Sequence, residues 1–146
     1  MPLTDFISST DQQRIVAAIG AAELQTSGEI RVHIEPKCKE ADPIKRAASV
    51  FNSLGMAHTR QRNGVLIYLA YKSRKFAIIG DCGINDRVPE NFWDTERNTL
   101  LQFLIESRPA DGICKIIEQI GEKLAEFFPY TDDDINEQSD EISYSE

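Results

Sequence analysis

Apolar and polar residues follow two periods along the chain, and the shorter period predicts three β-strands. Residues 29–35 (EIRVHIE) alternate strictly between apolar and polar side chains, which predicts a strand with one buried face. Residues 63–71 (NGVLIYLAY) are almost wholly apolar, as expected of a central strand covered on both faces. Residues 75–81 (KFAIIGD) follow a short KSR turn, so the last two strands are predicted to form a hairpin.

Apolar residues at intervals of three and four predict helices before, between and after these strands. The first helix is expected over residues 10–24, with Thr10 and Gln13 as a capping box. A third begins near residue 90, and the last covers the isoleucine-rich segment that stops at Pro129.

The second helix has clear start and stop signals. Asp42 and Pro43 are a favoured N-cap and first residue, and Gly55 is a typical terminator. Its buried face is predicted to consist of Ile44, Ala47, Ala48, Phe51 and Leu54.

The predicted order α-β-α-β-β-α-α favours a three-layer α/β/α sandwich around a small mixed sheet. The first two strands are joined by a helix, so we expect them to be parallel, whereas the hairpin makes the third strand antiparallel. The starts of the first two strands and the end of the third should therefore meet at one edge of the sheet.

Oxygen-bearing side chains are concentrated at that predicted edge. Glu29, Asp81 and Asp86 could supply carboxylates to Ca²⁺ or Mg²⁺, and Asn63 and Asn85 could supply amide oxygens. The alternative from the residues alone is that the two aspartates serve turns and helix caps, and that Glu29 faces solvent. Both interpretations stay open at this point.

A short basic loop, HTRQR, precedes the second strand and is expected to open onto the same edge. Arg60 and Arg62 in this loop are candidates for contact with an anion, with a solvated loop as the alternative. His33 lies on the polar side of the first strand, where a structural or solvated histidine is expected.

Composition assigns the chain to one soluble globular domain with a separate acidic end. The 146 residues are 41% hydrophobic and 27% charged. Residues 130–146 hold seven acidic and no basic side chains, which leaves 17 acidic and 16 basic residues elsewhere. We therefore expect a domain over residues 1–130 and a flexible acidic tail over 131–146, with docking of the tail on a basic partner as the alternative.

Charge, hydropathy and cysteine content indicate which partners are not expected and in which compartment the protein is expected. The nearly neutral domain gives no support to nucleic-acid binding. No apolar run is long enough for a membrane span and no signal peptide is apparent, so no membrane partner is expected. Three cysteines without metal-type spacing favour a reducing compartment, the cytoplasm.

Three segments in this order resemble the TPM-domain family. They are SGEIRVHIE, LGMAHTRQRNGVLIYLAYKSRKFAIIGDCGIN and VPENFWD. This family includes a thylakoid lumen protein linked to photosystem II repair and many bacterial proteins. The resemblance implies an α/β/α sandwich, divalent cation binding at one end of the sheet through Asp81, Asp86 and Glu29, and an acid phosphatase activity.

Two functions follow as hypotheses. The first is a cation-binding domain without chemistry of its own, which serves interaction with an unidentified protein or protein quality control. The second is a metal-assisted acid phosphatase acting on phosphomonoesters, in which the ion polarises a phosphoryl oxygen and Arg60 or Arg62 holds the phosphate. A domain with no ion at all is the third interpretation.

Overall fold

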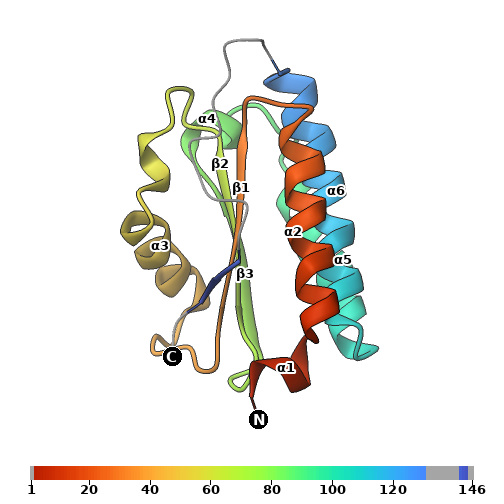
Figure 1. Ribbon diagram of the computed structural model, residues 1–146. Coiled ribbons are helices and arrows are strands. Elements are labelled where there is room, and N and C mark those ends of the chain that lie inside the picture. Colours follow the sequence, from red (N-terminus) through yellow and green to blue (C-terminus); the bar gives the residue numbers. More distant parts are fainter. Residues whose placement is uncertain (1, 131–141, 145–146) are drawn as a thin grey trace.

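The computed structural model describes residues 2–130 and 142–144 (Figure 1). The elements along the chain are α1 (Leu3–Phe6), α2 (Ser9–Glu23), β1 (Glu29–Glu35), α3 (Pro43–Ser53), a 3₁₀ helix η1 (Met56–His58), β2 (Gly64–Ala70), β3 (Lys75–Gly80), α4 (Cys82–Asn85), α5 (Phe92–Ile105), α6 (Pro109–Phe127) and β4 (Ser143–Tyr144). The predicted succession of longer elements is present. The short elements α1, η1, α4 and β4 are additions to it.

The sheet is mixed, with strand order β3-β2-β1-β4. β1 and β2 are parallel and β2 and β3 antiparallel, as the sequence predicts. The fourth strand was not expected: Ser143 and Tyr144 pair in parallel with His33 and Ile34 of β1. The expected tail over 131–146 lies largely outside the described residues, but Ile142 is buried against the sheet.

Helices cover both faces of the sheet and make a three-layer sandwich. Helices α2, α5 and α6 lie side by side on one face, and α3 lies on the other (Figure 1). The first face buries the alternating residues Ile30, Val32 and Ile34 of β1. The second buries a smaller cluster around Phe51 and Met56.

The polar side of β1 is buried as well, which differs from the predicted one-sided strand. Glu29 is 3% exposed, His33 4% and Glu35 2%. A charged strand face can leave water only when its groups find partners. At Glu35 the partner is Arg46, which extends from α3 to the carboxylate.

Two local predictions about helices were wrong. Helix α2 begins one residue earlier than predicted because Ser8, and not Thr10, is the N-cap and accepts a hydrogen bond from the amide of Asp11 at 3.1 Å. Ile44 and Ala48, predicted to lie on the buried face of α3, are both exposed, Ile44 to 54%, and Val50 is buried instead. The Asp42 cap of α3 is confirmed, since its side chain accepts from the amide of Ile44.

Candidate functional site

The sheet edge at the start of β2 brings together residues from three strands. Glu29 of β1 lies opposite Gly64 of β2 in the parallel register. The amide of Asp81, directly after β3, donates to the carbonyl of Gly64 at 2.9 Å. Glu29 and Asp81 thus flank one glycine, and strand alternation puts both on the sheet face that α3 covers.

The carboxylate of Asp81 is held by an arginine from the preceding loop. Arg62 donates from Nε and an Nη to the two Asp81 oxygens, at 2.6 and 2.9 Å. One of these oxygens also accepts from the amide of Cys82 at 2.8 Å, so Asp81 is the N-cap of α4. The side chain of Asp81 is 7% exposed and that of Arg62 is 50% exposed. The hydrogen bonds to Asp81 raise the pKa of Arg62.

Backbone packing fixes the loop that carries this arginine. The amide of Gly83 donates to the carbonyl of Arg62 at 2.8 Å. A Cβ at position 83 would lie 2.0 Å from the carbonyl oxygen of Gln61, a clash that only glycine avoids. Arg62 itself has a φ of 52°, in the left-handed region that non-glycine residues rarely adopt. The loop is therefore held in place by its backbone as well as by the ion pair.

Asn63, the next predicted ligand, is buried and serves the same loop. Its backbone amide donates to the hydroxyl of Thr59 at 3.3 Å, and its side-chain nitrogen donates to the hydroxyl of Ser27 at 3.4 Å. Its carbonyl accepts from the amide of Glu29. Asn63 thus connects the starts of β1 and β2 at the site.

The remaining predicted ligands lie on α4. Asn85 bridges two elements, because it donates to the carbonyl of Gly80 at 2.8 Å and accepts from the indole of Trp93 at 2.9 Å. Asp86 is exposed and is the C-cap of α4. Arg60 is exposed in the basic loop. The structure thus brings Glu29, Asn63 and Asp81 to one edge, whereas Asn85 is used in packing.

The oxygen donors at this edge are of the kind that divalent cations prefer, but the protein supplies few of them. The carboxylate of Asp81 already binds a positive group of the same chain. Among the described residues, however, no group of three His, Cys, Asp or Glu side chains is placed to hold a metal. An ion here would take one or two carboxylates and backbone carbonyls and keep several waters, a mode typical of Mg²⁺ and open to the flexible shell of Ca²⁺.

A second polar cluster at the opposite end of β1 was missed from the sequence. Glu35 accepts from Arg46 at 2.9 and 2.7 Å and from the hydroxyl of Tyr68. His33 lies 3.4 Å from Glu35 and 3.0 Å from the hydroxyl of Ser143 on β4. The sequence did hold a signal for this cluster. Glu35 lies on the polar face of β1, and the neighbouring strand β2 is apolar on both faces, so this face of the sheet had to be covered.

These features define an α/β/α domain with a bidentate arginine–carboxylate pair at one edge of a mixed sheet. The chain belongs to the TPM domain family, whose model matches residues 2–123. The resemblance found in the sequence is thereby confirmed. No helix of the described residues combines the length and apolar character that a membrane span requires.

Two solved structures are similar to this chain. The BA42 protein of the psychrophilic bacterium Bizionia argentinensis, solved by NMR, is 44% identical with a TM-score of 0.86, and the match covers 94% of each chain. The N-terminal domain of cg2496 from Corynebacterium glutamicum has a TM-score of 0.61 at 23% identity, over 81% of this chain and 74% of that chain, and shows the fold alone. No curated protein matches significantly.

Proposed function

We propose that this protein is a divalent-cation-binding domain and that the ion binds at Asp81 in place of the Arg62 guanidinium. The observation that carries the proposal is the arrangement of this pair. Both oxygens of a nearly buried carboxylate face a cation whose side chain is 50% exposed. The carboxylate is thus preorganised for positive charge, while its present partner can turn into water.

The cost of releasing Arg62 is small. The guanidinium of Arg62 is half exposed and regains water when it leaves, and the carboxylate of Asp81 passes from one positive partner to another without standing unpaired. A divalent ion carries twice the charge of the guanidinium in a smaller volume, so it interacts more strongly with the same carboxylate. Glu29, which lies beside Asp81 at this edge, and the loop carbonyls of residues 61 and 62 would be the further oxygen donors.

The test is a titration of the protein with Ca²⁺, and separately Mg²⁺, followed by backbone amide NMR. Shifts are expected in residues 27–29, 59–64 and 80–86. They should be lost in Asp81→Asn, which keeps the helix cap but removes the charge. The matched control is Asp94→Asn, an exposed aspartate in the first turn of α5, which should leave the titration unchanged. Identical titrations of Asp81→Asn and the unsubstituted protein would refute the site.

The acid phosphatase is the second candidate, and one feature of the site favours it. When Arg62 leaves Asp81, its guanidinium and the exposed Arg60 become available to phosphate oxygens beside the bound ion. The ion would polarise a phosphoryl oxygen and activate a water. Hydrolysis of p-nitrophenyl phosphate should then require the ion and be lost in Asp81→Asn. If the ion binds but hydrolysis is unaffected by this substitution, the phosphatase is refuted at this site and only the cation-binding function stands.

The location and biological role belong to the same proposal. All three cysteines are free, in keeping with a reducing compartment, and we propose the cytoplasm. An ion that replaces Arg62 would change the charge and mobility of an exposed loop, which suits a protein that recognises a protein partner according to its ion state.

A further inference from the structure

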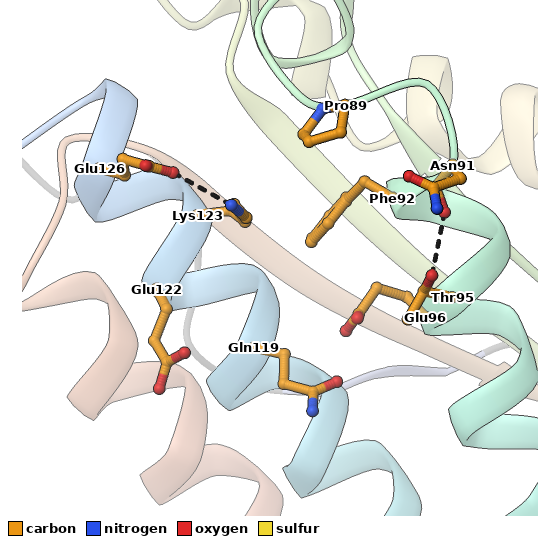
Figure 2. A pocket seen from close by; sticks show the side chains of 9 residues that line it. All are labelled: Pro89, Asn91, Phe92, Thr95, Glu96, Gln119, Glu122, Lys123 and Glu126. Carbon is orange, nitrogen blue, oxygen red and sulfur yellow. Dashed lines mark hydrogen bonds and ion pairs between the residues drawn. The ribbon is translucent and has the colours of Figure 1, made fainter.

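A second site candidate lies between α5 and α6, away from the arginine–aspartate pair. A cavity of about 550 Å³ opens there between the start of α5 and the second half of α6 (Figure 2). This volume lies within the range of pockets that bind small organic molecules, roughly 300–1,000 Å³. The ring of Phe92 and the side chains of Glu96 and Gln119 line it, together with Glu122, Lys123 and Glu126.

Glu96 is the unusual member of this cavity. It is 3% exposed, and its carboxylate points from α5 toward Gln119 on α6 (Figure 2). The side-chain amide of Gln119 lies 3.0 Å from both carboxylate oxygens and donates to both when its nitrogen faces them. Within the described part of the chain, no cationic side chain forms an ion pair with Glu96. A buried carboxylate that has only a neutral partner is costly to keep ionised.

The surrounding charges add to this imbalance. Lys123 is paired with Glu126 at 3.2 Å and so is already neutralised, whereas Glu122 adds a further negative charge. Burial, followed by repulsion from Glu122, raises the pKa of Glu96 to about 7, against the opposing effect of Lys115. The carboxylate is therefore near its midpoint at neutral pH, and a bound cation would favour its ionised form.

We propose that this cavity binds an organic cation, an ammonium or guanidinium group on an aliphatic stem, with Glu96 as its counter-ion. The cavity is far larger than a bare metal ion, and its carboxylates do not form a three-ligand metal group within the described residues. The ring of Phe92 offers a wall against which an aliphatic stem can pack and a cation can interact. The Gln119 amide oxygen can turn to accept from the bound group. This proposal is independent of the ion at Asp81.

The test is a titration of the full chain with n-butylammonium and with n-butylguanidinium, followed by amide and Phe92 ring NMR signals. Shifts are expected at residues 89–96 and 115–126. Affinity should rise about tenfold between pH 6 and pH 8, because binding needs ionised Glu96 and a carboxyl of pKa near 7 goes from mostly protonated to mostly ionised over this interval. Surface carboxylates are fully ionised throughout that range and would give no such rise.

Glu96→Gln keeps the shape and removes the charge, so binding should weaken by about tenfold or more and lose its pH dependence. Glu118→Gln, an exposed glutamate of α6 that does not line this cavity, is the matched control and should bind as the unsubstituted protein does. Equal affinity in Glu96→Gln, shifts outside the cavity, or a flat pH profile of the unsubstituted protein would each overturn the proposal. If Glu96→Gln folds poorly, the pH profile decides alone.

The cation could belong to a small amine or to a lysine or arginine side chain of a partner protein. A blocked Gly-Lys-Gly peptide, titrated beside n-butylammonium, distinguishes these sources. Tighter binding of the peptide assigns the cavity to a protein side chain, and tighter binding of the free amine assigns it to a small molecule. If neither the peptide nor n-butylammonium binds, the proposed site is contradicted.

Discussion

The two ends of the sheet carry the same chemical unit, an arginine–carboxylate pair, in different surroundings. At one end Arg46 binds Glu35 through two hydrogen bonds, and at the other end Arg62 binds Asp81 in the same way. The side chain of Arg46 is 21% exposed and that of Arg62 is 50% exposed. The difference lies in how much of each pair the fold encloses.

The Glu35 pair is part of the structure. Burial disfavours ionisation of Glu35, yet hydrogen bonds from Arg46 and Tyr68 outweigh it and lower the pKa of this carboxyl to about 2. The aromatic rings of His33 and Tyr68 stack beside it, with centroids 6.1 Å apart. A cation from solvent would have to remove several partners at once to reach Glu35. Only the Asp81 end combines a charged carboxylate with a partner that can leave.

The largest expected effect is on stability, at the enclosed end. Glu35→Gln should lower the free energy of unfolding by about 3 kcal/mol, because it leaves Arg46 without its counter-ion in a mostly buried position. Asp81→Asn should cost much less, since the guanidinium of Arg62 is half exposed and can return to water, and asparagine also caps helices. Urea unfolding of both variants, with the exposed Glu40→Gln as control, makes the measurement. Equal losses at the two ends would contradict the comparison.

Low pH should also destabilise the protein through the Glu35 pair, with a smaller effect between pH 5 and pH 3 than the substitution has. Glu35 has a folded pKa of about 2 against an ordinary value of 4.5, so its contribution is complete above pH 4.5 and is lost as pH falls toward 2. Urea unfolding at pH 5, 4 and 3 should show a steeper decline in the unsubstituted protein than in Glu35→Gln. Parallel declines would mean that Glu35 is not held ionised. His33, whose pKa is lowered by burial, adds a separate loss that begins at higher pH.

The fold was largely predictable because its signals are local. The apolar run of β2, the Asp42–Pro43 start of α3 and the spacing of isoleucines in α6 each specify one element, and short connections then restrict the topology. β4 escaped prediction because two residues carry no periodic pattern, and their pairing with β1 depends on a partner more than a hundred residues away.

The candidate site was predictable in position but not in its partners. Strand directions alone bring Glu29 and Asp81 to one edge. That Arg62 would bind Asp81, rather than an external anion, depends on a left-handed φ at Arg62 and on the close approach of Gly83 to this loop. Side-chain pairing of this kind arises from the tertiary packing of two loops, which no single segment encodes.

The most direct test of the central claim compares two neighbouring arginines. Arg62→Gln and Arg60→Gln remove the same charge from the same loop, but only the first releases the carboxylate of Asp81. Calcium affinity, measured by NMR titration of the shifts at residues 80–86, should rise by up to about fivefold in Arg62→Gln, because the ion no longer competes with the guanidinium, and much less in Arg60→Gln. Equal affinities in the two variants, or weaker binding in Arg62→Gln, would contradict the account.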